Sequence, residues 1–237
     1  MTNHGVTRDT LERLAQFDTC TLSNAVERLN VRPRNEGFTC GSMVCRFPFL
    51  RPVVGYAVTA RIRSYSPPVS RRCYYENMEW WQYVAASPAP RIVVLQDCDE
   101  RPGFGALFGE IHARICRALD CVACITNGSV RDLDGIEALG FQLYSGSVSV
   151  SHAYAHVIEF GHAAEVGGLR IASGDLLHGD RHGVLSLPGP VAADLPAVAE
   201  HVLSDDREMF ELCDAADFSL ARLREKIQQP AEARRCY

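Results

Sequence analysis

The stretch RIVVLQDCDERPGFGALFGEIHARICRALDCVACITNGSVRD, residues 91–132, decides the fold. Its first apolar run, residues 91–96, predicts a buried strand that ends at a group of acidic residues. A glycine-rich turn, residues 102–105, leads to residues 107–119, where apolar side chains recur at helical spacing. Residues 121–125 predict a second buried strand. Strand, helix and strand in succession are typical of an α/β fold.

The segments on both sides extend this pattern. Residues 53–63 alternate and are rich in β-branched side chains, so they predict another strand. Residues 141–144 predict a strand, and further strands separated by glycine turns follow up to residue 188, which favours a mixed sheet. No segment has the composition of an inter-domain linker, so we expect a single domain over residues 1–237. We also expect helices over residues 10–17, 74–85 and 132–139 and near the C-terminus, a helix capped by Ser23-Asn24, a loop over residues 30–51 and a turn at Asn127-Gly128.

Composition and charge exclude several classes of protein. Hydrophobic residues make up 47% and charged residues 22% of the 237 residues, which are values of a globular protein. The net charge of -5 argues against a general binder of nucleic acid or anionic membranes, which would carry a basic surplus. No apolar run approaches the ~20 residues of a membrane span, and the first residues lack the features of a signal peptide. We therefore expect a cytoplasmic protein.

The cysteines and the lysine limit the possible chemistry. The 10 cysteines are scattered and lie mostly in apolar runs, so we expect free thiols rather than disulfides. Cys121 and Cys124 form a CxxC pattern, but in a strand residues three apart point to opposite faces, which predicts core cysteines. The single lysine, Lys226, lies in a charged C-terminal segment. A Schiff base needs a desolvated lysine and a P-loop needs one after its glycines, so the sequence argues against both.

Two segments have the composition of a ligand site in an α/β fold, where ligands bind beyond strand ends and at helix N-termini. Residues 105–110 offer backbone N–H groups and the carboxylate of Glu110, and residues 127–132 place Arg131 beside Asp132. The two carboxylates suit a hard cation such as Mg²⁺, and the arginine can hold a substrate carboxylate through two hydrogen bonds. The plain structural alternative is a helix N-cap with a surface charge next to it.

Four segments, in order and at matching spacing, turn this pattern into a resemblance. They are VGYAVT (residues 54–59), GALFGE (105–110), NGSVRD (127–132) and the glycine and aspartate pairs at residues 174–184. Over residues 53–188 the chain resembles the RraA-like family, which includes the 4-hydroxy-4-methyl-2-oxoglutarate and 4-carboxy-4-hydroxy-2-oxoadipate aldolases. The resemblance implies a single compact α/β sandwich of the swivelling-domain type with a mixed central sheet.

The resemblance also implies an activity and roles for named residues. Asp132 would bind Mg²⁺ or Mn²⁺ directly, and Glu110 would hold a water bound to that metal. Arg131 would bind the pyruvyl end of the substrate together with the backbone amides of Ile111 and His112, at a helix start that includes Gly109. The implied enzyme is a class II retro-aldolase or decarboxylase that cleaves a 4-hydroxy-2-oxo diacid or oxaloacetate to give pyruvate.

The resemblance also allows a non-catalytic function and implies a homo-oligomer. Some members are non-catalytic regulators that bind a protein of RNA degradation, and this chain differs from a pure regulator in carrying both Glu110 and Asp132. Family members form homotrimers or hexamers with their sites between subunits, so the resemblance implies a homo-oligomer. The expected ligand is a small 2-keto acid, with no nucleic acid and no membrane as partner.

Two departures from the family pattern set further questions. Glu110 stands where the aldolases have aspartate, which keeps the charge and adds one methylene. Residues 151–156 are absent from the pattern, and their alternating His152, Tyr154 and His156 would share one face of an extended segment, as part of a substrate pocket or of a subunit contact. A second metal site at His178, Asp180 and His182 is disfavoured, because the flanking glycines predict a turn.

Overall fold

A computed structural model describes residues 6–69 and 75–228 of the chain. Residue 74, the first of the helix predicted at residues 74–85, lies outside this range, and the helix itself, α3, runs over Met78–Ala86. The other helices are α1 (Arg8–Leu14), α2 (Thr19–Leu29), α4 (Glu110–Ala118), α5 (Leu133–Ala138), α6 (Leu195–Asp214) and α7 (Leu220–Gln228), with a 3-10 turn η1 at Gly189–Val191.

A mixed sheet in the order β1-β6-β5-β3-β2-β10-β11 forms the centre of the fold, as predicted, with β4 paired to β5 and β7 to β2. The pairs β2–β3, β3–β5 and β5–β6 are parallel, whereas β10 is antiparallel to both β2 and β11. The strands are β1 (Val44–Cys45), β2 (Val53–Arg63), β3 (Arg91–Asp97), β4 (Ala106–Phe108), β5 (Cys121–Val130), β6 (Gln142–Val148), β7 (His156–Phe160), β8 (Ala164–Val166), β9 (Leu169–Ile171), β10 (Leu176–Asp180) and β11 (Gly183–Leu187).

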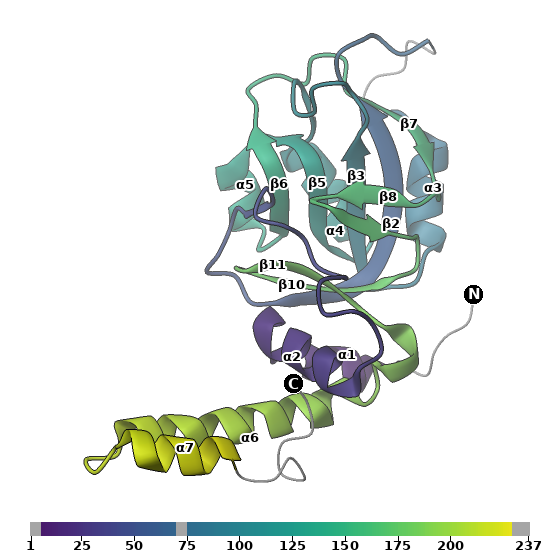
Figure 1. Cartoon of the computed structure of the whole chain (residues 1–237). Helices are drawn as coiled ribbons and strands as arrows, with labels where there is room; N and C mark the ends of the chain where they lie inside the picture. Colours follow the sequence, from purple (N-terminus) through teal and green to yellow (C-terminus); the bar gives the residue numbers. More distant parts are fainter. Residues whose placement is uncertain (1–5, 70–74, 229–237) are drawn as a thin grey trace.

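Three apolar clusters fill the spaces around this sheet, which curls towards a closed barrel (Figure 1). One lies between the sheet and helices α3, α4 and α5, and includes Trp80, Leu95 and Ile136. A second, inside the curl, joins β2, β3 and β5 to the β8–β9 hairpin. The third packs α1, α2 and the start of α6 against β10 and β11. Alternate residues of β3 belong to the first two clusters, so this strand is covered on both faces.

The strands show where the sequence prediction was right and where it was wrong. The strand at residues 53–63 is confirmed with the same bounds, and the one at residues 91–96 extends by a single residue. Asn127-Gly128 is not a turn, because the register of β5 against β6 shifts between Thr126 and Ser129 and the two residues stay within the strand as a bulge. The residues before Glu110 form β4 rather than helix, because they pair with β5.

The N-terminal predictions need two corrections. Helix α2 begins earlier than expected, because Asp18 caps it by accepting a hydrogen bond from Thr21 N at 2.8 Å, so the cap is not Ser23-Asn24. The loop expected at residues 30–51 includes the short strand β1, which pairs with β6. Helix α1 confirms the first predicted helix, with its end at Leu14 rather than residue 17.

Buried thiols lie in the core as predicted, but not in the predicted orientation. Cys116, Cys121 and Cys124 are buried and free, and all three belong to the cluster beneath α3 and α4. Cys121 and Cys124 share this cluster because the register of β3 against β5 shifts by one residue between them. Cys20, Cys40 and Cys213 are exposed.

Helices α6 and α7 form a pair that projects from the body of the molecule (Figure 1). Only the first part of α6 is buried, up to Val202, and α7 has no buried residue. Lys226 joins the two helices by an ion pair to Glu208 at 2.5 Å. Within the described ranges, no helix has both the length and the apolar character needed to cross a membrane.

Candidate active site

Arg131 and Asp132 lie together at the end of β5, as the sequence predicts. Asp132 is the residue before α5 and has a left-handed backbone (φ 56°), which a non-glycine residue adopts uncommonly. Its Oδ1 accepts a hydrogen bond from Arg131 Nε at 3.1 Å. The two side chains are 28% and 37% exposed, so the ion pair is open to a ligand from solvent.

The N-terminus of α4 faces the same carboxylate. Glu110 N donates to Asp132 Oδ2 at 3.2 Å, which couples the start of α4 to the start of α5. Gly109, the residue before α4, allows this approach, because a Cβ there would lie 2.6 Å from Asp132 Oδ2. The amides of Ile111 and His112 belong to the first turn, where N–H groups have no acceptor within the helix. Together with the helix dipole they favour an anion at this end of α4.

The Glu110 side chain makes contacts that the sequence did not predict. Its Oε1 accepts hydrogen bonds from Arg114 Nε at 2.8 Å and Nη2 at 2.5 Å. Its other oxygen lies against Gly135 of α5, where a Cβ would stand only 2.3 Å away. In this conformation Glu110 therefore bridges α4 and α5.

The His112 imidazole belongs to the core rather than to the site. The residue is buried, and its ring lies 5.5 Å from that of Trp81 and 5.9 Å from that of Phe108. The position can serve a ligand through its backbone amide, which is the group that the sequence prediction used.

His152 contacts Arg131 directly. The two ring nitrogens, Nδ1 and Nε2, lie 3.2 Å and 3.4 Å from Arg131 Nη1. The pKa of His152 is lowered, first by burial and then by the Arg131 charge. A neutral imidazole can accept a hydrogen bond from the guanidinium through one nitrogen, which suits the observed contact. Residues 151–156 thus reach the site.

This segment is not extended, so the expected shared face of His152 and Tyr154 is wrong. Ala153 takes a left-handed conformation (φ 47°) and turns the chain between them. Ser151 O accepts a hydrogen bond from Ala106 N at 2.9 Å, and Gly105 is needed because a Cβ there would stand 2.4 Å from His152 O. His156 begins β7 and bonds Tyr154 O through Nδ1 at 2.7 Å.

An acidic network beside the site escaped the sequence prediction. Asp97 is buried and accepts hydrogen bonds from Gly103 N at 2.8 Å and Asp99 N at 3.0 Å, which hold the loop before β4. Burial raises the pKa of Asp97. Asp99 Oδ2 accepts hydrogen bonds from Ser64 N and Oγ at 2.7 Å and 2.9 Å. The signal in the sequence was the acidic group after the strand at residues 91–96.

His178, Asp180 and His182 meet, but in a structural role. His178 and Asp180 are buried in β10, whereas His182 lies in the turn before β11. Asp180 accepts hydrogen bonds from Thr19 N at 2.9 Å and His182 N at 2.8 Å, so it anchors the start of α2. Across the described ranges, no group of three His, Cys, Asp or Glu side chains is arranged to hold a metal ion.

Comparison with known proteins gives one family and a set of similar folds. The family model described as RraA-like, Aldolase/RraA, matches residues 19–186. No curated protein sequence matches the chain. Several solved structures match the fold at under 20% sequence identity.

Three of them illustrate the range. An uncharacterized protein from Pseudomonas syringae pv. tomato is 18% identical, with a TM-score of 0.72 over 95% of this chain and 97% of its own. RraAS2 from Streptomyces coelicolor, an unusual member of the RNase ES inhibitor RraA protein family, is 16% identical, with a TM-score of 0.64 over 86% and 96%. The RNA-processing inhibitor RraA from Thermus thermophilis is 16% identical, with a TM-score of 0.51 over 69% and 92%.

Proposed function

Because the chain belongs to the RraA-like family, which includes class II aldolases, we propose that it is a divalent-metal-dependent lyase that cleaves a 2-keto acid to release pyruvate. The observation that carries the proposal is the convergence of Arg131, Asp132 and the first turn of α4 at one exposed position. The substrates we propose are a 4-hydroxy-2-oxo diacid or oxaloacetate, because loss of the distal part of either one leaves pyruvate.

The donor set suits one hard cation such as Mg²⁺ or Mn²⁺. Asp132 is exposed enough to be a ligand, and each of its oxygens accepts one hydrogen bond, which leaves lone pairs for a metal. Mg²⁺ typically takes one or two protein carboxylates and completes its shell with water and substrate. Asp132 would bind the cation directly and Glu110 through water, and the bound cation would supply a Lewis acid for the 2-keto oxygen.

Arg131 and α4 would orient the substrate. Arg131 uses Nε for Asp132 and Nη1 for His152, so the Nη2 hydrogens are available for the substrate carboxylate. The first-turn amides of Ile111 and His112 add two donors to the same anion-binding corner. When the C3–C4 bond breaks, its electron pair moves towards the keto oxygen, and the distal part leaves either as a carbonyl compound, with loss of the 4-hydroxyl proton, or as CO₂ from oxaloacetate. The guanidinium and the helix N-terminus would then stabilise the developing negative charge. A proton from water then adds to C3 and gives pyruvate.

The test is pyruvate release from 4-hydroxy-2-oxo diacids and from oxaloacetate. We expect turnover with Mg²⁺ or Mn²⁺, loss of turnover with EDTA and recovery when metal is restored. Borohydride with substrate should trap no adduct, because the single lysine lies on α7, paired with Glu208 of α6. Absence of turnover with every substrate and both metals would contradict the proposal and favour a non-catalytic regulator.

Site variants separate the two main roles. Asp132→Ala should abolish metal binding and lower kcat severely, whereas Arg131→Ala should impair both KM and kcat. Loss of such a transition-state contact costs ~3–4 kcal/mol, or on the order of 10²–10³ in rate. Asp134→Ala is the matched control, since it removes an exposed carboxylate from the first turn of the same helix. Kinetics of Asp132→Ala equal to those of Asp134→Ala would place the site elsewhere.

A further inference from the structure

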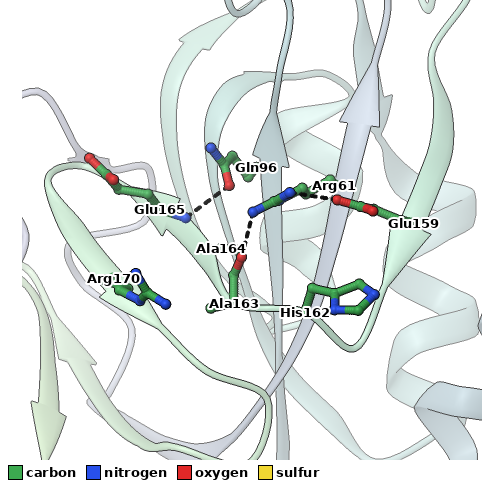
Figure 2. Close-up of a pocket in the computed structure, with 8 residues that line it drawn as sticks. All are labelled: Arg61, Gln96, Glu159, His162, Ala163, Ala164, Glu165 and Arg170. Carbon is green, nitrogen blue, oxygen red and sulfur yellow. Dashed lines mark hydrogen bonds and ion pairs between the residues drawn. The ribbon is translucent and has the colours of Figure 1, made fainter.

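A cavity of about 430 Å³ opens at the ends of β2 and β3, beside β7 and the β8–β9 hairpin (Figure 2). It shares no residue with the candidate active site. Its volume lies within the ~300–1,000 Å³ of typical small-molecule sites. The cavity is lined by Arg61, Gln96, Glu159, His162, Ala163, Ala164, Glu165 and Arg170.

Two side chains from the sheet hold the wall of this cavity in place. Arg61 donates to Glu159 Oε1 at 2.6 Å and to Ala163 O at 3.1 Å. Gln96 Oε1 accepts a hydrogen bond from Glu165 N at 3.0 Å, which ties the start of β8 to β3. Figure 2 shows Arg61 and Gln96 reaching from the strands towards the chain at Ala163 and Ala164. The cavity therefore has a wall fixed by hydrogen bonds.

Arg170 and Glu165 are the two charged lining residues whose side chains take no part in these contacts. They stand directly opposite each other in the β8–β9 register, where side chains of opposite charge can readily pair. Among the described residues, however, neither side chain forms a hydrogen bond or an ion pair. Both are exposed and line the cavity, and they lie on its hairpin side (Figure 2). The cavity thus presents one available cation and one available anion side by side.

We infer that this cavity binds a small zwitterion, such as a free α-amino acid, with its carboxylate on Arg170 and its ammonium group on Glu165. The four formal charges of the lining sum to zero, and Arg61 and Glu159 already neutralise each other. A dianion would face the unpaired Glu165, and a simple cation would leave Arg170 unpaired. A ligand with both charges satisfies both groups. The inference stands independently of the proposed lyase activity, since it involves other residues.

The remaining polar groups of the lining would contact the rest of the ligand. His162 is exposed on the opposite side of the cavity, next to Glu159 (Figure 2). Its ring can donate or accept a hydrogen bond, and the Gln96 amide nitrogen can donate. These groups suit an amino acid with a polar side chain better than one with a hydrocarbon side chain.

Calorimetric titration of the full chain tests the charge requirement. The probes are free L-amino acids, followed by the 2-hydroxy acid and the decarboxylated amine that match the best binder. We expect saturable binding of at least one amino acid, and at least a tenfold weaker affinity for each analogue. One charge-assisted hydrogen bond is worth roughly 1.5–3 kcal/mol, which is tenfold or more in Kd. No binding by any amino acid, or equal binding by the hydroxy acid, would overturn the inference.

Two variants test whether Arg170 and Glu165 bind the charged groups of the ligand. Arg170→Gln and Glu165→Gln should each weaken binding at least tenfold without altering the circular dichroism of the protein, because both side chains are exposed. Arg207→Gln, an exposed arginine of α6, is the matched control and should bind like the parent. Unchanged affinity in both cavity variants would overturn the assignment. Since the readout is binding, loss of the proposed lyase activity would leave this test unaffected.

Discussion

At the scale of single residues, His152 restricts the orientation of Arg131 in the candidate site. Its imidazole contacts Arg131 Nη1, so it limits the positions that the guanidinium can take. We predict that His152→Ala raises KM several-fold for both oxaloacetate and a longer diacid, because both depend on Arg131. His152→Gln should restore part of the loss, since its amide oxygen can accept the same hydrogen bond.

His156→Ala is the control for this prediction. That imidazole bonds the Tyr154 carbonyl within the same segment, away from Arg131. Its KM should match that of the parent protein for both substrates. If the KM of His152→Ala rose only for the longer diacid, His152 would instead contact the distal part of the substrate.

His178 makes the stability of the fold depend on pH. Its Nε2 donates to Phe17 O at 3.1 Å, and its Nδ1 lies 2.9 Å from Thr19 Oγ1, from which a neutral ring accepts a hydrogen bond. Burial lowers its pKa to about 4 from 6.5. Below about pH 6.5 the unfolded chain binds the proton more readily than the folded one. The contribution of His178 to the free energy of unfolding is therefore fully present above that pH and falls as the pH drops towards 4.

The expected loss is about 2 kcal/mol between about pH 7 and about pH 5. Urea denaturation at the two pH values measures it. His178→Gln lowers stability at both values because its bonds to α2 are altered, but the difference between the two should shrink. The exposed His201→Gln should keep the parent's difference. An undiminished pH dependence in His178→Gln would assign the effect to another group.

At the scale of elements, Asn127 joins β3 to β5. Its side chain accepts a hydrogen bond from Asp97 N at 2.7 Å and donates one to Asp97 O at 3.0 Å. We predict that Asn127→Ala lowers the free energy of unfolding by about 2 kcal/mol, from two lost bonds of about 1 kcal/mol each. Chemical denaturation beside Glu137→Ala, an exposed control, measures this. A loss no larger than that of the control would show that the pairing of the two strands does not need this side chain.

The same residue shows how far the sequence can predict these elements. Strands β2 and β3 follow from local patterns, because alternation and apolar runs are properties of neighbouring residues. Asn127-Gly128 has a local preference for a turn, but pairing with β6 and bonds to Asp97 keep it in the strand. For the site, the chain order placed Arg131 and Asp132 together at a helix start. The contact of His152 with Arg131 depends on side-chain positions that no spacing encodes, whereas Glu110 and Arg114 stand four residues apart on α4, a spacing that favours their ion pair.

At the scale of the whole molecule, exposed apolar side chains cluster in the sequence segments around the candidate site. Tyr65 and Phe104 contact each other edge to face at 5.2 Å, and both are more than half exposed. Val150 and Tyr154 flank His152 and are also exposed. Exposed apolar groups of this kind are typical of contact surfaces between proteins. We therefore propose a homotrimer or hexamer assembled through this region.

Sedimentation measures the mass of the assembly and so tests this proposal directly. We expect the mass of a trimer or hexamer for the parent protein and a smaller mass for Phe104→Ser. Phe210→Ser, on the projecting helix α6, removes an equally exposed ring and should leave the mass unchanged. A monomer in the parent protein would contradict the proposed assembly.

The division of the thiols between core and surface determines which cysteines are open to oxidation by air. Cys20, Cys40 and Cys213 meet solvent and will oxidise or form cross-links between molecules, whereas Cys116, Cys121 and Cys124 cannot react until the core opens. Covalent dimers through the first set would mimic a genuine assembly in any mass measurement made without reductant. An alkylating mass tag, located by peptide mapping, distinguishes the two sets, because a tag on Cys116, Cys121 or Cys124 marks a molecule whose core has opened.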